Sequence, residues 1–158
     1  MATEIERVFL VADASVVAGV EGALIRQGYL SVDPDRVVRV RRTADAAWLT
    51  LKGRADGPVR AEFEYPIPRD DADALLELCR GSIVSKRRHR LPAGGGLTWE
   101  VDVFLDANDG LVVAEIELPA ADATFDRPAW LGPEITDDHR YRNASLAERP
   151  FTTWPERS

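Results

Sequence analysis

The chain has 158 residues and a formal net charge of −7, with 45% hydrophobic and 30% charged residues. This length supports one domain with a core rather than two. We therefore expect a single domain over residues 1–158, with a C-terminal helix and tail at 138–158. The acidic balance disfavours nucleic-acid binding through bulk charge. With one cysteine and two histidines, an intrachain disulfide and a Cys-rich metal site are excluded, and a His-rich site is disfavoured.

The compartment is predicted from two further features. No stretch reaches the ~20 apolar residues of a membrane span, so no membrane association is expected. The first residues are acidic and lack the basic and apolar regions of a signal peptide. We therefore expect a cytoplasmic protein.

Alternation of apolar and polar residues predicts strands along most of the chain. In chain order we expect a strand at 4–12, a helix at 15–20, strands at 24–32, 36–43, 47–54 and 59–67, a helix at 69–79, strands at 82–91, 97–105 and 111–118, and helices at 120–126 and 138–148. The turn signals Asp56-Gly57-Pro58 and Gly94-Gly95-Gly96 fit hairpin-length links. Eight strands in succession predict a mainly antiparallel β (α+β) fold whose sheet closes into a barrel or splits into a sandwich.

Like-charged residues recur two positions apart within these strands, and residues at i and i+2 of a strand share a face. The acidic pairs are Glu4 and Glu6, Glu62 and Glu64, Glu100 and Asp102, and Glu115 and Glu117. The basic pairs are Arg39 and Arg41, Lys52 and Arg54, and Lys86 and Arg88. A flat sheet with its polar face in water is one interpretation. A cavity in which the two signs face each other is the other, because basic side chains suit phosphate oxygens and carboxylates suit a divalent cation.

The segment Glu4-Ile5-Glu6-Arg7-Val8 resembles the ExExK signature of the CYTH superfamily, the triphosphate tunnel metalloenzymes. Further segments resemble its short bacterial branch in the same order, over about residues 3–148: Arg26–Leu30, Arg39–Arg41, Thr50–Lys52, Glu62–Glu64, Lys86–Arg88, Glu100–Phe104, Ala114–Glu117 and Thr136–Asn143. The resemblance implies a closed eight-stranded antiparallel barrel with short helices packed outside. It also implies hydrolysis of inorganic triphosphate, or of a related triphosphate-containing small molecule, with Mg²⁺ or Mn²⁺.

The resemblance also implies roles for individual residues. Tyr29, Lys52 and Arg41 are the expected catalytic residues. The expected phosphate-binding residues are Arg39, Arg41, Lys52, Arg54, Lys86, Arg88 and Arg140. The expected metal ligands are Glu4, Glu6, Glu62, Glu64, Asp102, Glu115 and Glu117. His139 is expected to be a surface helix residue.

One position departs from the signature, because Val8 stands where the motif has lysine. In related enzymes that lysine is expected to pair with the tyrosine that Tyr29 matches, and a valine donates no hydrogen bond to phosphate. Two functions therefore stay open: a triphosphatase weakened by Val8, and a binding module for triphosphate or a nucleotide with little or no turnover. A class IV-type adenylate cyclase and a thiamine triphosphatase rank below both. A monomer or a homodimer fits either function.

Overall fold

The computed structural model describes residues 2–155. Its strands are β1 (Ala2–Val11), β2 (Gly22–Ser31), β3 (Val37–Arg42), β4 (Ala47–Lys52), β5 (Val59–Pro66), β6 (Arg80–Gly94), β7 (Leu97–Phe104), β8 (Val112–Glu117) and β9 (Leu131–Glu134). Its helices are α1 (Arg69–Glu77) and α2 (Asn143–Glu148), and short 3₁₀ turns occupy Ala14–Val17, Asp106–Asn108, His139–Tyr141 and Phe151–Thr153. All eight strands expected from alternation are present.

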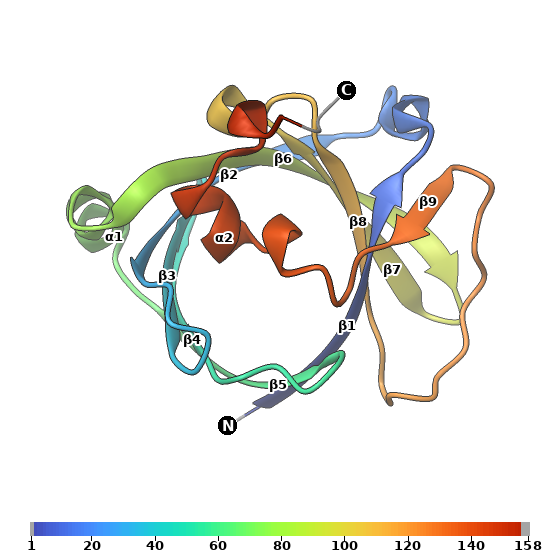
Figure 1. Cartoon of the computed structure of the whole chain (residues 1–158), viewed down its shortest axis with the longest axis horizontal. Coiled ribbons are helices and arrows are strands. Elements are labelled where there is room, and N and C mark those ends of the chain that lie inside the picture. Colours follow the sequence, from blue (N-terminus) through green and yellow to red (C-terminus); the bar gives the residue numbers. More distant parts are fainter. Residues whose placement is uncertain (1, 156–158) are drawn as a thin grey trace.

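Strands β1 to β8 form a closed antiparallel barrel, as the resemblance implied (Figure 1). The sheet order is β5-β4-β3-β2-β6-β7-β8-β1, and β1 also pairs with β5. The first part of β1 makes this closing contact, in which Ile5 lies opposite Val59. The same strand pairs with β8 from Glu6 to Leu10. Because alternate residues of a barrel strand point inward, this closure turns the charged faces of most strands toward one enclosed space.

Apolar residues on the outside of the barrel are covered in separate patches. Helix α1 buries Ala72 and Leu76 against Val40 and Ala47 of β3 and β4. The segment 119–130 covers β1, β7 and β8, where an aromatic cluster gathers around Trp99. The Trp99 ring lies 5.5 to 5.8 Å from three other rings, those of Phe9, Phe125 and Trp130, all in edge-to-face contact.

This covering segment corrects the expected helix at 120–126, which the structure shows as turns and irregular chain. Its alanines and acidic residues suggested a helix, but the side chains of Ala123 and Phe125 pack on the barrel wall instead. The segment then continues into β9, an unexpected ninth strand that adds to the edge of β1 beyond its pairing with β5. The sequence of β9, Leu-Gly-Pro-Glu, is too short and too rich in Gly and Pro to predict a strand.

Helix α2 lies across one end of the barrel, over the opening that the ring of strands encloses (Figure 1). Its Leu146 and Ala147 are buried against inward-facing apolar residues at that end, including Val84, Phe104 and Val113. The expected helix at 138–148 is therefore divided into a 3₁₀ turn and α2, with Arg142 in extended conformation between them. Among residues 2–155, no helix is long and apolar enough to cross a membrane.

Candidate active site in the barrel

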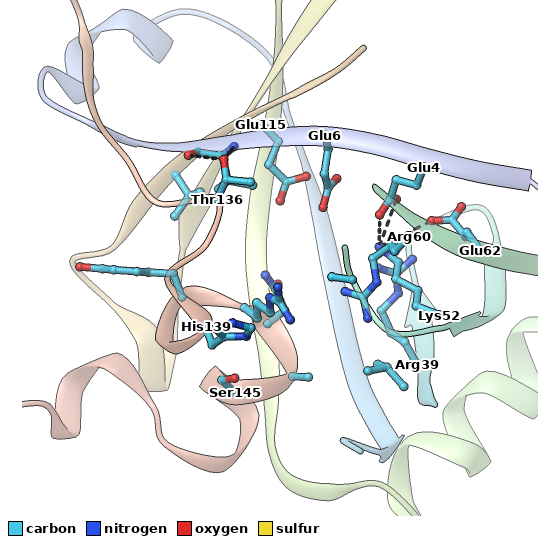
Figure 2. Close-up of a pocket in the computed structure, with 18 of the residues that line it drawn as sticks. Glu4, Glu6, Arg39, Lys52, Arg60, Glu62, Glu115, Thr136, His139 and Ser145 are labelled. Carbon is cyan, nitrogen blue, oxygen red and sulfur yellow. Dashed lines mark hydrogen bonds and ion pairs between the residues drawn. The ribbon is translucent and has the colours of Figure 1, made fainter. Parts of the chain in front are cut away.

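The barrel encloses a cavity of about 420 Å³ that most of the expected site residues line (Figure 2). The expected residues in its wall are Glu4, Glu6, Tyr29, Arg39, Arg41, Lys52, Glu62, Glu64, Lys86, Arg88, Glu115 and Glu117. A second cavity of about 570 Å³ shares Arg41, Glu64, Arg88 and Arg90 with the first. The two spaces therefore meet inside the barrel, and α2 lies at the end that belongs to the first.

The carboxylates come from β1, β5 and β8, which are neighbours in the barrel wall. Figure 2 shows Glu4, Glu6 and Glu115 projecting from adjacent strands into the same space. Burial, together with the nearby charges of Glu115 and Glu4, raises the pKa of Glu6 from 4.5 to about 8. A hydrogen bond with Glu4, aided by burial, raises the pKa of Glu62 to about 7. This wall thus concentrates more negative charge than its own cations neutralise.

Lys52 and Arg39 extend from β4 and β3 toward these acids. The Lys52 Nζ lies 3.0 Å from Glu4 Oε1 and 3.5 Å from Glu62 Oε2. The Arg39 guanidinium lies 3.4 Å from Glu64 Oε2 and 3.2 Å from Thr50 Oγ1. Each cation therefore already contacts a carboxylate, and a phosphate entering the cavity would exchange these partners for its own oxygens.

Lys86 and Arg88 form the deepest basic group, held by Asp102 of the neighbouring strand. Arg88 makes a two-pronged ion pair with Asp102, both bonds at 2.8 Å, and Lys86 Nζ lies 2.8 Å from the same carboxylate. Lys86 and Asp102 are each 1% exposed. Burial alone would raise the pKa of Asp102, but the two cations hold it well below its usual range. Asp102 therefore orients the two basic side chains.

Arg41 differs from the other four expected phosphate-binding residues in the lining, because within residues 2–155 it makes no ion pair with a carboxylate. Its Nε donates to Gln27 Oε1 at 3.0 Å. Burial, together with the charges of Arg39 and Arg88, lowers its pKa from 12.5 to about 9. A half-buried cation without a counter-ion favours binding of an anion.

Three expected site residues lie away from the cavity lining. Arg54 follows the end of β4, is 69% exposed and pairs with Asp35. Arg140 pairs with Asp138 and lies over the rings of Tyr141 and Trp154. Asp102, expected as a metal ligand, lies behind Lys86 and Arg88, and both its oxygens are engaged by them. The structure thus brings the other expected residues together in the cavity lining, to which these three do not belong.

Val8 lines the same cavity and belongs to an apolar part of its wall. It packs against a cluster that includes Tyr29, Val113 and Ile135. Its backbone is fixed on both sides, by the β8 pairing with Glu115 and by a hydrogen bond from its N–H to Thr136 Oγ1. The position of the motif lysine therefore faces the cavity, but it supplies an apolar surface.

Several lining residues were missed by the sequence reasoning. They are Gln27, Arg60, Thr136, His139, Arg142 and Asn143. Alternation contained the signal for two of them, because Gln27 is in phase with Tyr29, and Arg60 is in phase with Glu62. His139 is exposed, as expected, but it lies on the 3₁₀ turn before α2 and also lines the cavity (Figure 2). The tail residues carried no pattern that indicated an inward direction.

The donor set of the acidic wall suits a hard divalent cation. It offers carboxylate oxygens only, which are the ligands that Mg²⁺ and Mn²⁺ prefer. Burial of Glu6, the Glu4–Glu62 hydrogen bond and the neighbouring carboxylate charges raise the pKa values of Glu6 and Glu62, and a divalent cation would offset that charge. Among residues 2–155, no three acidic, His or Cys side chains already converge as a ready-made metal site.

Comparison with known proteins agrees with this geometry over almost the whole chain. The inorganic triphosphatase of Acetivibrio thermocellus is 44% identical over 157 residues, covering 99% of this chain and 100% of that protein. The inorganic triphosphatase of Nitrosomonas europaea is 36% identical, covering 92% and 97%. The crystal structure of the inorganic triphosphatase NE1496 superposes with a TM-score of 0.64 at 34% identity, covering 93% and 95%. The model of the CYTH domain matches residues 2–150, and the chain belongs to this family, whose triphosphate tunnel members are typically metal-dependent.

Proposed function

We propose that this protein hydrolyses inorganic triphosphate inside its barrel, with Mg²⁺ or Mn²⁺ bound by the acidic wall. One observation carries the proposal: a single cavity of about 420 Å³ brings five basic side chains opposite a group of carboxylates. The basic residues are Arg39, Arg41, Lys52, Lys86 and Arg88, and the acidic ones are Glu4, Glu6, Glu62, Glu64, Glu115 and Glu117. The names of two relatives that match over nearly their full length support the same substrate.

The residues of the chain divide the work by charge. Arg39, Arg41, Lys52, Lys86 and Arg88 hold the phosphate oxygens and stabilise the negative charge that spreads over the transferred phosphoryl group. The closed wall of strands keeps these donors fixed, so they need little rearrangement during the reaction. A bound divalent ion would neutralise phosphate charge and position the attacking water. Glu4, Glu6, Glu115 and Glu117 would hold that ion, and Glu62 and Glu64 would support a second ion or orient water.

Phosphate release from tripolyphosphate, measured with Mg²⁺ and with Mn²⁺, tests the proposal directly. The matched control is the Glu4→Ala/Glu6→Ala double variant, which removes two ligands from the acidic wall and leaves every phosphate-binding side chain in place. We expect release by the wild-type protein and loss of release by the control. Release no faster than in the control would overturn the proposal.

The place of Val8 in the cavity wall favours one second candidate, a triphosphate-binding protein with little turnover. Calorimetry would then show binding of tripolyphosphate without phosphate release. Parallel assays with ATP, scored for cyclic AMP, and with thiamine triphosphate test the remaining alternatives. Binding of tripolyphosphate together with its turnover would exclude the non-catalytic candidate.

A further inference from the structure

We propose that Gln27 and Asn143 are positioning residues of this site, whose paired side-chain amides aim Arg41 and Lys86 at phosphate oxygens and leave the Tyr29 hydroxyl free to donate to the same group. The inference rests on the proposed function and adds two residues to it. Neither residue is charged, and neither belongs to the basic or acidic sets. Both line the cavity, Gln27 from β2 and Asn143 from the first turn of α2.

The contacts determine which way each amide faces. Arg41 Nε and Lys86 Nζ can only donate, so the atoms they contact must be oxygens. Arg41 Nε donates to Gln27 Oε1 at 3.0 Å, and Lys86 Nζ donates to Asn143 Oδ1 at 2.9 Å. Gln27 Nε2 must then be the donor in its contact with Asn143 Oδ1 at 2.8 Å. The chain of contacts is therefore consistent in one orientation of both amides.

The same orientation assigns the role of the tyrosine hydroxyl. Gln27 Nε2 also lies 3.0 Å from the Tyr29 oxygen, which must accept this hydrogen bond. The proton of the Tyr29 hydroxyl is then available to a group in the cavity that the ring lines. Burial raises the pKa of Tyr29, which keeps the hydroxyl protonated and suits it to donate. Tyr29 thus offers a hydrogen bond to phosphate and has a neutral amide as its partner.

Burial makes Gln27 difficult to replace. Gln27 is fully buried. Its side chain makes three hydrogen bonds, with Tyr29, Asn143 and Arg41. The β2 strand has an irregular register between Gln27 and Tyr29 where it pairs with β6, yet both side chains meet on the inner face. Through Asn143 the network also ties α2, which covers one end of the barrel, to the deepest cation.

The Gln27→Glu variant tests the link to Tyr29, because it keeps the shape and the acceptor for Arg41 and removes the donor NH₂. We expect the tyrosine hydroxyl to turn toward the new carboxylate and kcat for tripolyphosphate to fall by about 100-fold, as misaligned reacting groups typically cost. KM should also rise, because the carboxylate now competes for Arg41. In a Tyr29→Phe background the kcat loss should shrink below about 10-fold, while the KM change persists. Equal kcat losses in both backgrounds would overturn the inference.

The Asn143→Leu variant tests the link to Lys86 independently. We expect KM to rise by about 10-fold or more, because Lys86 loses its acceptor and α2 loses its contact with the site. The control is Asn108→Leu, which removes a fully buried amide that lines neither cavity and whose Oδ1 accepts from the Phe151 N–H. This control should lower the unfolding midpoint without changing KM. An unchanged KM in folded Asn143→Leu, or the same KM change in the control, would refute the role.

Failure of the proposed function would be visible separately. If the wild-type protein releases no phosphate, the triphosphatase proposal fails, and tripolyphosphate affinity by calorimetry then decides the positioning role. Wild-type affinity about 10-fold above that of Asn143→Leu would support it, and equal affinities would overturn it.

Discussion

Replacing Glu6 by Gln should stabilise the metal-free protein, although it removes a residue of the proposed metal site. Glu6 lies on β1 between Glu4 and the strand β8 that carries Glu115. Burial and these two neighbouring carboxylates raise its pKa from 4.5 to about 8. The folded protein therefore holds a proton on Glu6 under conditions in which the unfolded chain has released it. Gln has nearly the same shape and carries no charge that burial would penalise.

The size of the effect follows from the two pKa values. A carboxyl group with a raised pKa lowers the free energy of unfolding as pH rises between its unfolded and folded values. For 4.5 and about 8 the penalty is below about 1 kcal/mol at pH 5, about 3 kcal/mol at pH 7 and about 5 kcal/mol above pH 8. These are upper values, since Lys52 and the neighbouring acids rearrange when Glu6 ionises. We therefore expect Glu6→Gln to add about 1 to 3 kcal/mol at pH 8 and almost nothing at pH 5.

Urea unfolding with a chelator at pH 5, 7 and 8 measures this difference directly. The control is Glu148→Gln, which neutralises an exposed acid of α2 that lies outside the cavity lining and should change stability little at any of these pH values. With Mn²⁺ added, the wild-type protein should gain stability and Glu6→Gln should gain less, because a ligand-binding folded state is stabilised by mass action. A stability gain that is absent, or that does not grow with pH, would refute the assignment of Glu6 as a strained, proton-holding acid.

Two further substitutions probe the neighbouring wall. Val8→Lys should raise kcat for tripolyphosphate by about 10-fold. This is less than the ~100-fold that losing a preorganised donor costs, because the surrounding wall is not preorganised for a lysine. Steady-state kinetics measure the change, and unchanged turnover would show that the site is complete without that cation. Asp102→Asn should lower the free energy of unfolding by about 3 to 5 kcal/mol near neutral pH, because Lys86 and Arg88 lose their shared carboxylate. Since the pKa of Asp102 is held low, this difference should shrink as pH falls below about 4 in urea titrations, and a loss under about 1 kcal/mol would contradict the role.

The strands and their inner faces were predictable because a strand repeats every two residues. Glu4 and Glu6, or Lys86 and Arg88, had to share a face once the strand was recognised, and the cavity lining agrees. The rule fails beyond the strand ends. Arg54 continues the phase of Lys52, but β4 stops at Lys52 and the arginine turns outward to Asp35.

Closure of the barrel and the pairing of its charges required information that alternation does not contain. A flat sheet and a barrel have the same inward and outward pattern, and the resemblance to a family favoured the barrel. Asp102 has the same phase as Glu100, yet it lies behind two cations at 1% exposure. The depth of an acidic side chain along the barrel axis depends on the register between strands. This depth decides whether the acid can bind a metal ion or pairs with a buried cation. Residues of the C-terminal segment line the cavity because Leu146 packs against the end of the barrel. No local sequence pattern predicts this packing.

The apolar wall at Val8 and the amide partner of Tyr29 have related consequences. A lysine at that position would bring a positive charge toward the tyrosine and lower its pKa, which would favour the ionised hydroxyl. Val8 brings no charge, and burial raises the pKa of Tyr29 although the charges of Arg39, Arg41 and Lys52 act to lower it. Within residues 2–155, the one hydrogen bond to its oxygen comes from the neutral amide of Gln27. In this chain the tyrosine is therefore suited to donate a hydrogen bond, and the basic residues of the other strands stabilise the negative charge of the phosphate. If the protein turns triphosphate over, it does so chiefly through fixed cations and a bound metal, so its rate should depend more steeply on Arg41 and Lys86 than on Tyr29.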